Sequence, residues 1–506
     1  MAIQSRAPSV YSSKMTIFHG LHRAVALHSA RPAILEAGRT HSYGDFYQRV
    51  LRCAQALRGQ GIHHGDRVAV LMLNSPRYLE LYFATAALGA VIVPINTRWN
   101  AADVDFCLRD SGTKLLITDV AFDAVVCPAV PIHRHDAEYE PMIEAAAPLD
   151  PPTALDEEDL AALMYTSGTT GGPKGVMLTH RNLYTHALQV IAELEIRPDW
   201  IYLHAAPMFH AANCALMYAL AFKGAANVFL PAFRPEQWLE SLQQHRVTCA
   251  VLVPTMWHLI VNHPRVAEFD TSSLTHGLYG GSPMTPDLLC RVTERFGPIF
   301  IQVYGMTEAC PVITLQHAAE HRPEKAGTAG RPMMGTDVRV VDDRDQDVPL
   351  GTAGEILMRG PHRMKGYWNR PDANAEVLRG GWLHTGDLGR FDAEGFLYVL
   401  DRKKDMVKTG GENVYCPEVE AVLTAHPQVL EAVIFGIPDA KWGESLRAAV
   451  VLRPGAGTAE SELIAFCRQR LTHFKCPSSV EFHQSLPKGG SGKVQKSELR
   501  RAHWPA

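Results

Sequence analysis

The sequence predicts an α/β protein with a large N-terminal domain of layered α/β sheets and a small α+β C-terminal domain. Helix-like and strand-like segments alternate along most of the 506 residues, which is typical of mostly parallel sheets covered by helices. Near residue 400, a strand-like run is followed by DRKKDMVKTGGEN, dense in charge and then in glycine, and by a compact α+β stretch. We therefore expect domains at residues 1–402 and 403–506, with a hinge at 402–405.

The N-terminal alternation can be followed element by element. The segment 42–61, SYGDFYQRVLRCAQALRGQG, has helical apolar spacing and ends on glycine, and DRVAVLML follows it as a buried strand. The same order recurs in PRYLELYFATAALGA and VIVPI, and KLLITD at 114–119 is a further strand. VTCAVLVP–TMWHLIVNH and LTHGLYGGSP, a helix and PIFIQVYG continue the pattern. These repeats of strand and helix indicate layered sheets.

The composition excludes several classes of protein. Hydrophobic residues make up 46% and charged residues 20%, as in an ordinary globular chain. A formal charge of −4 argues against a nucleic-acid partner. The ten cysteines form no C-x-x-C pair, which favours reduced thiols over disulfides or zinc. No stretch has the pattern of a signal peptide or of a transmembrane segment, so we expect a cytoplasmic protein.

The stretch MYTSGTTGGPKGVMLTH, residues 164–180, contains a flexible loop with a lysine at its far end. Such a loop offers backbone N–H groups, hydroxyls and an ammonium to a polyanion. It does not match the Walker pattern, because Pro173 stands where the second glycine belongs and Gly175 replaces Ser/Thr. The apolar elements on either side favour a site, but the residues alone leave a solvated linker as the alternative.

Four further motifs are ambiguous when each is taken alone. Gly280–Ser282 lies between a strand and a helix and either admits a flat ligand or is a simple turn. Glu308, in VYGMTE at a strand end, either binds Mg²⁺ or caps the next element. Asp387, in a glycine-flanked turn, either contacts a ribose or bonds its own backbone. Lys493, in a second glycine loop, is by itself most simply a solvated charge.

Together, the motifs YTSGTTGGPKG, GGSP, YGMTE, GWLHTGDLG, DRKKD, KTGGENVY and LPKGGSGK resemble those of the adenylate-forming superfamily. That superfamily includes acyl-CoA synthetases, adenylation domains of peptide synthetases and luciferases. The resemblance extends from about Thr16 to the end of the chain, and GGENVY, DAKWGE and SGK make the chain most similar to fatty-acyl and aryl-acid CoA ligases.

The resemblance implies a two-step reaction and a mobile C-terminal domain. A small carboxylic acid, either a medium or long fatty acid or an aromatic one, attacks the α-phosphate of ATP and gives acyl-AMP and pyrophosphate. The small domain then rotates, and CoA displaces AMP. ATP, Mg²⁺ and CoA are thus the expected cofactors and cosubstrate. The sequence leaves the oligomeric state open, a homodimer included.

The resemblance also implies residue roles. The β- and γ-phosphates are expected to contact Thr166, Ser167, Gly168, Thr169, Thr170, Gly171 and Lys174. The adenine is expected to contact Gly280, Gly281, Ser282 and Tyr304. Thr307 is expected to contact the α-phosphate and Glu308 to bind Mg²⁺. Asp387 matches the ribose ligand and Arg402 a second ribose or phosphate contact, Lys404 matches the hinge position, and Lys493 matches the lysine that bridges the carboxylate and the α-phosphate.

PMFHAANCALMYAL, residues 207–220, resembles the segment that begins the acyl pocket, with His210 at its mouth. An isolated histidine is otherwise more often structural. The small residues Ala211, Ala212 and Gly280 leave room for a bulky group, but they do not decide between a fatty chain and an aromatic ring.

Two other functions share these motifs. An amide synthetase would pass the acyl group from acyl-AMP to an amine instead of CoA. A non-catalytic adenylate- or acyl-binding protein is disfavoured, because such a protein would not need Lys174, Glu308, Asp387 and Lys493 together. Loading of a separate carrier protein is a third, weaker alternative.

We predict that Lys493→Ala impairs acyl-AMP formation but spares thioester formation from supplied acyl-AMP. A positive charge is needed where the carboxylate meets the α-phosphate, but not where CoA displaces AMP. Measuring the two half-reactions separately tests this role, and an equal loss in both would contradict it.

Overall fold

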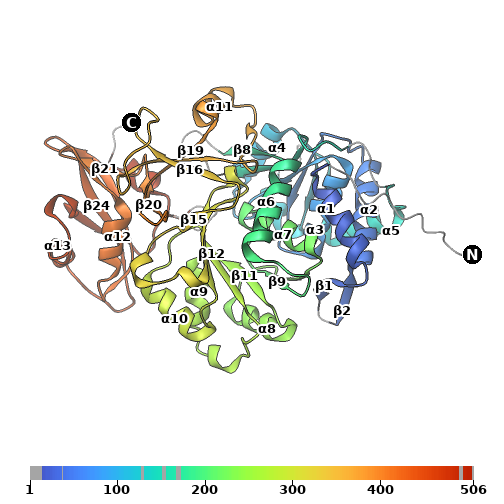
Figure 1. Ribbon diagram of the computed structural model, residues 1–506, viewed down its shortest axis with the longest axis horizontal. Coiled ribbons are helices and arrows are strands. Elements are labelled where there is room, and N and C mark those ends of the chain that lie inside the picture. Colours follow the sequence, from blue (N-terminus) through green and yellow to red (C-terminus); the bar gives the residue numbers. More distant parts are fainter. Residues whose placement is uncertain are drawn as a thin grey trace, which may run out of the picture. The chain divides into compact units, whose positions relative to one another are not determined.

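The computed structural model describes residues 14–36, 38–126, 130–150, 155–166, 173–488 and 494–503, which form two compact units (Figure 1). Unit 1 takes its described residues from Met1–Gly168, Gly172–Val338 and Met358–Leu383, and unit 2 from Arg339–Leu357 and His384–Ala506. The predicted α/β class, with a large N-terminal and a small C-terminal part, is confirmed. The predicted domain boundary after residue 402 stays a prediction, and unit 2 also includes residues 384–402.

The first sheet of unit 1 has nine strands, with a parallel centre. In spatial order they are β15 (Arg331–Pro332), β14 (Val312–Gln316), β13 (Phe300–Gly305), β12 (His276–Gly280), β11 (Cys249–Leu252), β9 (Ile201–His204), β10 (Ala226–Phe229), β1 (Pro32–Glu36) and β2 (Arg39–Ser42). Strands β14, β15 and β2 pair antiparallel at the two edges.

The second sheet of unit 1 has seven strands. In spatial order they are β18 (Gly366–Tyr367), β8 (Lys174–Thr179), β7 (Leu160–Thr166), β4 (Val91–Pro94), β3 (Arg67–Leu71), β5 (Thr113–Thr118) and β6 (Ile132–Arg134). Strands β3 to β7 pair in parallel, whereas β8 is antiparallel to both β7 and β18. Three of these strands, β3, β4 and β5, confirm the strands predicted in DRVAVLML, VIVPI and KLLITD.

The helices of unit 1 begin and end where local chemistry allows. The predicted helix at 42–61 is confirmed as α2, which begins with a reciprocal capping box between Ser42 and Asp45. Gly89, Gly112 and Gly224 end three helices in the left-handed conformation. The helices are α1 (Ile17–His28), α2 (Tyr43–Gly59), α3 (Pro76–Leu88), α4 (Ala101–Ser111), α5 (His135–Ala145), α6 (His180–Leu194), α7 (Ala211–Lys223), α8 (Pro235–His245), α9 (Pro254–Val261), α10 (Pro286–Phe296) and α11 (Pro371–Val377).

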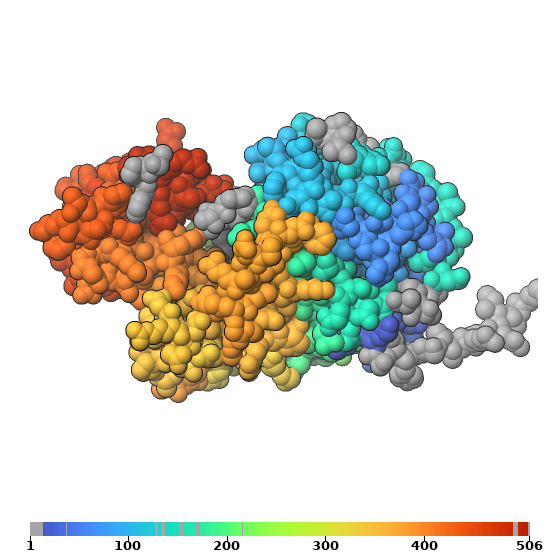
Figure 2. All heavy atoms as spheres, turned by 90° about the horizontal axis from the view of Figure 1, so that it is seen from above, coloured from blue at the N-terminus to red at the C-terminus, as the bar shows by residue number. Residues whose placement is uncertain are grey.

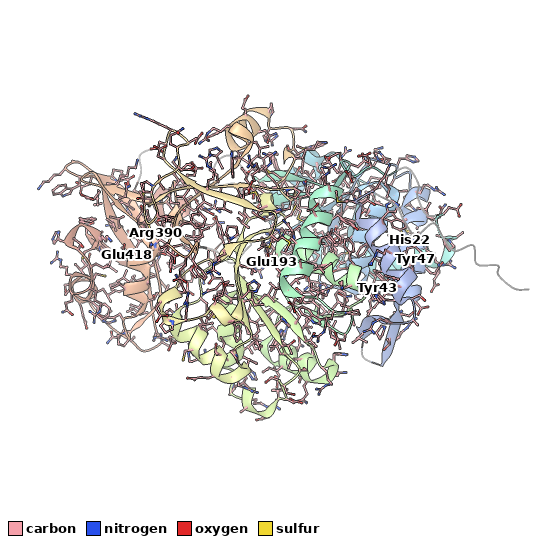
Figure 3. All side chains as sticks on the ribbon, in the orientation of Figure 1. His22, Tyr43, Tyr47, Glu193, Arg390 and Glu418 are labelled. Atoms are coloured by element: carbon pink, nitrogen blue, oxygen red, sulfur yellow. The ribbon has the colours of Figure 1, made fainter. Side chains whose placement is uncertain are left out.

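The main core of unit 1 joins both sheets to helices α1, α2, α3, α6 and α7. Some of its members also hold helices in place by hydrogen bonds: Tyr43 donates to the Ala225 carbonyl oxygen, and the Tyr47 hydroxyl lies 2.7 Å from Nδ1 of His22 (Figure 3). Within unit 1, segments far apart in the sequence lie side by side: β18 is paired with β8, and the light-orange atoms of residues 358–383 lie against green ones in Figure 2.

Unit 2 contains two smaller sheets. Most residues of the four-stranded sheet β16 (Asp337–Val341), β17 (Gly354–Arg359), β19 (Leu383–Phe391) and β20 (Leu397–Arg402) belong to it. The five-stranded sheet comprises β22 (Glu412–Val414), β21 (Val407–Thr409), β24 (Gly443–Leu452), β23 (Val429–Asp439) and β25 (Ser479–Phe482), accompanied by α12 (Cys416–Thr424), α13 (Glu460–Arg468) and α14 (Lys496–Arg501). Arg390 lies over the Tyr398 ring, and Glu418 pairs with Lys475 at 2.7 Å (Figure 3).

In the part of the chain that the structure describes, no helix is both long enough and apolar enough to cross a bilayer.

A second core in unit 1 is built on tryptophan. Trp257 of α9 is fully buried, its ring packs edge-to-face on Trp238 at 5.6 Å, and its indole donates to the Leu278 carbonyl oxygen at 3.1 Å.

We predict that Trp257→Ala lowers the free energy of unfolding by about 3–5 kcal/mol, because it leaves a large cavity. Leu259→Ala on the exposed face of the same helix is the control and is expected to change it by less than about 0.5 kcal/mol. Equal urea midpoints for the two variants would contradict the prediction.

Candidate active site

In unit 1, the predicted adenine-binding residues come together at the carboxyl ends of two neighbouring parallel strands. β12 ends at Gly280 and β13 ends at Gly305, and Gly280 is paired with Val303. A Cβ at Gly280 would lie 2.6 Å from the Val303 carbonyl oxygen, and Gly281 has a φ of +80°. Both glycines are therefore required by the backbone itself, whether or not a ligand binds. Ser282 is exposed and Tyr304 is half-buried beside them.

Glu308 lies just after this strand end, in the short 3-10 helix η3 (Thr307–Ala309). Its side chain is 6% exposed, and its Oε1 accepts a hydrogen bond of 2.8 Å from the Tyr367 hydroxyl. Its carbonyl oxygen accepts a second bond, of 2.8 Å, from the Met364 N–H. The carboxylate is thus held in one orientation at the edge of the sheet where Thr307, half-buried, also lies.

The two ends of the predicted phosphate loop meet in the second sheet. Thr166 ends β7, Lys174 begins β8, and these two residues are paired in the antiparallel ladder. The predicted ligands Ser167, Gly168, Thr169, Thr170 and Gly171 lie outside the described residues. The Lys174 ammonium lies 5.2 Å from the centroid of the Tyr367 ring. Tyr367 therefore contacts both Lys174 and Glu308.

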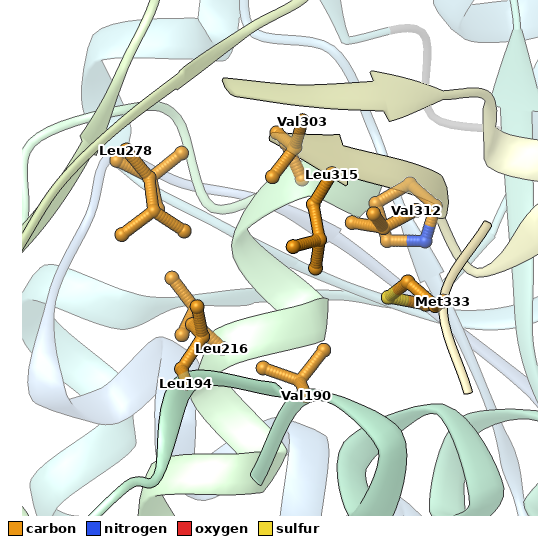
Figure 4. Close-up of a pocket in the computed structure, with 11 residues that line it drawn as sticks. Val190, Leu194, Leu216, Leu278, Val303, Val312, Leu315 and Met333 are labelled. Carbon is orange, nitrogen blue, oxygen red and sulfur yellow. The ribbon is translucent and has the colours of Figure 1, made fainter. Parts of the chain in front are cut away.

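An apolar cavity opens next to the carboxyl ends of β12 and β13 (Figure 4). Its lining comes from α6, α7, the strands β11 to β14, Pro311 and Met333, and every lining side chain is Val, Leu, Ala, Pro or Met. Leu278 lies two residues before Gly280, and Val303 lies one residue before Tyr304, so the cavity is lined by the same two strands that carry the predicted adenine contacts. Such a cavity fits an apolar group and disfavours a charged one.

The segment before α7 places His210 near this cavity. His210 is the N-cap residue of α7, and Ala212, two residues later, is exposed and lines the cavity. Ala211 and Gly280, which are also small, do not line it. Two side chains hold the preceding loop: Asn74 accepts from the Met208 N–H at 2.8 Å, and the Tyr82 hydroxyl donates to the Met208 carbonyl oxygen at 2.8 Å.

In unit 2, the two predicted ribose contacts are brought together. Asp387 is paired with Arg402 across β19 and β20, and Oδ1 of Asp387 lies 2.7 Å from Nε of Arg402. The predicted turn at Asp387 is wrong: the residue lies inside β19, because Gly386 with a φ of +70° allows a local bend without ending the strand.

Unit 2 also contains Lys404, the predicted hinge residue, and Cys416, the first residue of α12. Lys404 is exposed, and partial desolvation of its ammonium lowers its pKa. Cys416 is fully buried, and burial raises the pKa of its thiol, so it lacks the properties of a nucleophile. Lys493 lies outside the described residues, which include its flanks: Lys488 and Val494 are paired as a bridge.

Sequence reasoning missed Tyr367 and Asn74. Tyr367 lies 59 residues after Glu308, and Asn74 lies 134 residues before Met208. Neither belongs to a motif that signals chemistry. The nearest signal for Asn74 was the apolar run VAVLML before it, which indicates burial and not a partner. Tyr367 lies between Lys365 and Arg370 and has no such run beside it.

Comparison with known proteins gives consistent matches over nearly the whole chain. The family model for the AMP-binding enzyme matches residues 21–368, and that for the AMP-binding enzyme C-terminal domain matches residues 418–493. The chain is 44% identical over 478 residues to a feruloyl-CoA synthase from an Amycolatopsis species, covering 93% of this chain and 95% of the relative.

Two solved structures are similar as well. One is the o-succinylbenzoate coenzyme A synthetase from Bacillus subtilis in complex with ATP and magnesium ion, with a TM-score of 0.86 and 32% identity over 95% of this chain and 98% of that one. The other is the amide bond synthetase McbA from Marinactinospora thermotolerans, with a TM-score of 0.87 and 30% identity over 97% and 100%.

A titratable pair lies next to one of the residues that line the cavity. Glu193 of α6 accepts a hydrogen bond from the Met334 N–H at 2.7 Å, next to the lining residue Met333, and it lies 3.4 Å from Nε2 of His317 (Figure 3). The hydrogen bond to Glu193 raises the pKa of His317 above 6.5, and that bond in turn lowers the pKa of Glu193 below 4.5.

We predict that Glu193→Gln destabilises unit 1 most at about pH 5.5 and hardly at about pH 9. The raised pKa of His317 contributes stability that is complete below 6.5 and lost as pH rises through the folded value, whereas the contribution of Glu193 is lost as pH falls below 4.5. Because His317 is 41% exposed, the loss is expected to stay below about 1 kcal/mol. Gln keeps an acceptor for Met334, so a loss independent of pH would contradict this assignment.

Proposed function

Because the chain belongs to the AMP-binding enzyme family, we propose that it is an AMP-forming acid–CoA ligase that activates an aromatic carboxylic acid of the feruloyl type. The observation that carries the proposal is the apolar cavity beside the ends of β12 and β13, where the predicted nucleotide contacts lie. The acid would be joined to AMP with release of pyrophosphate, and CoA would then take the acyl group.

The cavity supports an acid with an apolar body. None of its lining side chains is charged or polar, so the carboxylate stays at the open end while the remainder of the acid is buried. Burial of a flat ring or a chain stabilises the complex by about 25 cal/mol per Å² of apolar surface. The 44% identity to a feruloyl-CoA synthase favours an aromatic acid over a fatty one.

The charged residues of unit 1 suit the first step. A carboxylate and a triphosphate repel each other, so the reaction needs positive charge and alignment rather than a general base. We assign Lys174 and the loop that begins at Thr166 to the β- and γ-phosphates, Thr307 to the α-phosphate and Tyr304 with Gly280–Ser282 to the adenine. His210 is assigned to the mouth of the acid pocket.

Glu308 fits a magnesium ion that arrives with ATP. Mg²⁺ commonly takes one or two carboxylates and completes its shell with phosphate oxygens and water. Within the described residues, no group of three or more His, Cys, Asp or Glu could hold a metal ion by itself, whereas Glu308 presents a carboxylate in a fixed orientation. The ion, when bound, would offset negative charge on the phosphates.

Three residues of unit 2, and Lys493 outside the described residues, complete the assignment. Asp387 and Arg402 are assigned to the ribose, Lys404 to the hinge that lets the C-terminal part rotate after the first step, and Lys493 to the carboxylate and α-phosphate. An amide synthetase is the second candidate, favoured by the similarity to McbA, and it would share every one of these adenylation residues.

Product analysis by mass spectrometry tests the function. The purified protein would be given ATP, Mg²⁺ and ferulic, benzoic or palmitic acid, with CoA, with a simple amine, or with neither. We expect feruloyl-CoA and AMP only when CoA is present. Palmitoyl-CoA as the main product would move the acid class to fatty acids, and an amide without thioester would favour the second candidate. No acyl-AMP from any acid would refute adenylation.

We predict that Ala212→Phe raises the KM for the acid by about tenfold or more and leaves the KM for ATP unchanged, because the new ring would occupy part of the cavity that Ala212 lines. Ala212 is exposed, so the substitution need not disturb the core. Leu188→Phe, on the exposed face of α6, is the control. Steady-state kinetics with each substrate varied in turn gives the answer, and parallel rises in both KM values would argue against this location for the acid.

A further inference from the structure

We propose that Tyr367 is a positioning residue that arranges Lys174 and Glu308 together and thereby sets the affinity for magnesium–ATP. The inference rests on the proposed function, because it takes these two residues as ligands of the phosphates and of the ion. Tyr367 is assigned no contact with substrate.

The hydroxyl of Tyr367 fixes the carboxylate. It donates to Oε1 of Glu308 at 2.8 Å, and the two side chains are 8% and 6% exposed. A hydrogen bond to an ionised acceptor is stronger than one between neutral groups, and burial shields it from competing water. Because the phenol ring has few torsions, this bond restricts the rotation of the carboxylate before any ion arrives.

The ring of the same residue lies beneath the lysine. The Lys174 ammonium is 5.2 Å from the ring centroid, within the range of a cation–π contact. Such a contact is weaker than an ion pair with phosphate, so the ring can hold the ammonium near the start of β8 without preventing its transfer to ATP. One side chain thus orders a cation and a carboxylate that the proposed function requires at the same nucleotide.

Hydrogen bonds from Asn374 and from strand β8 hold the backbone of Tyr367 and its neighbours in place. Its N–H donates to Oδ1 of Asn374 at 2.6 Å, and Nδ2 of Asn374 donates to its carbonyl oxygen at 2.9 Å. It is paired with Val176 in β8, and the Trp368 N–H donates to the Gly175 carbonyl oxygen at 2.8 Å. The segment is therefore tied to the strand that begins at Lys174 and, through Met364, to the backbone of Glu308.

A purely structural tyrosine would show the same contacts, so the test must separate the two roles. Tyr367→Phe keeps the ring and removes only the hydroxyl. Titration calorimetry would measure ATP binding to the full chain with and without Mg²⁺. We expect the gain in ATP affinity that Mg²⁺ provides to fall about tenfold, as for the loss of a hydrogen bond to a charged group. ATP affinity without the metal is expected to stay unchanged.

Tyr367→Leu removes the ring as well. Lys174 then loses its contact and must be ordered when ATP binds, so we expect a further loss of about threefold that also appears without Mg²⁺. Asn374→Ala leaves the tyrosine in place but releases its backbone, and we expect a smaller loss of the Mg²⁺-dependent affinity. This variant keeps the inference testable if Tyr367→Leu does not fold.

Tyr139→Phe is the matched control. Its hydroxyl donates to Oε2 of Glu80 at 3.0 Å, and both residues are 1% exposed, so the substitution removes the same kind of bond elsewhere in unit 1. We expect Tyr139→Phe to leave ATP affinity unchanged both with and without Mg²⁺. In a Glu308→Ala background, Tyr367→Phe should add nothing, because the group it positions is gone.

Three results would overturn the inference: equal losses with and without Mg²⁺ in Tyr367→Phe, an unchanged affinity in that variant, or additive effects with Glu308→Ala. A different set of results would contradict the proposed function itself. If the wild-type chain binds no ATP or forms no acyl-AMP, the function falls. If it forms acyl-AMP and Tyr367→Phe binds magnesium–ATP normally, only the positioning role falls.

Discussion

The parallel pairing of β12 with β13 is the constraint on which the candidate site of unit 1 depends. Parallel strands end at the same edge of a sheet, and this register pairs Gly280 with Val303, directly before Tyr304. The pairing is so close at Gly280 that a Cβ there would meet the Val303 carbonyl oxygen. The residues that follow, Thr307 and Glu308, must then lie at the same edge.

The same two strands divide the site into a polar and an apolar part. Leu278 and Val303 point into the cavity, whereas the residues just beyond them carry the predicted nucleotide contacts (Figure 4). Under the proposed function, these strand ends would present an apolar surface to the body of the acid and polar groups to its carboxylate. This separation matters, because a charge drawn into the cavity would lose its hydration without gaining a partner.

Asp387, Glu193 and Glu308 each have a side-chain partner before any ligand binds. Asp387 is held by Arg402, Glu193 lies beside His317, and Glu308 accepts from Tyr367. Pairing fixes the geometry of each group, so less ordering remains to be done when an anionic substrate arrives. The cost is that a ligand must compete with an existing partner, as a ribose would at Asp387.

Local sequence determined much of this protein. The helical apolar spacing and closing glycine of residues 42–61 and the alternation of strand and helix act over a few residues, so they predict α2, β3 to β5 and the α/β class. The motifs likewise indicated Gly280, Glu308 and Asp387, because their glycines and strand ends carry a local signal.

Tertiary structure decided the rest. The bond from Tyr367 to Glu308 spans 59 residues, the clamp of Asn74 on Met208 spans 134, and Lys174 meets Tyr367 only because β18 joins the edge of the second sheet at β8. The apolar lining of the cavity was equally hidden, since Val, Leu and Met in a sequence show burial but not whether a space is left between them. The physical reason is that local signals come from backbone conformation and periodicity, whereas a side-chain partner or a cavity exists only once distant strands have paired.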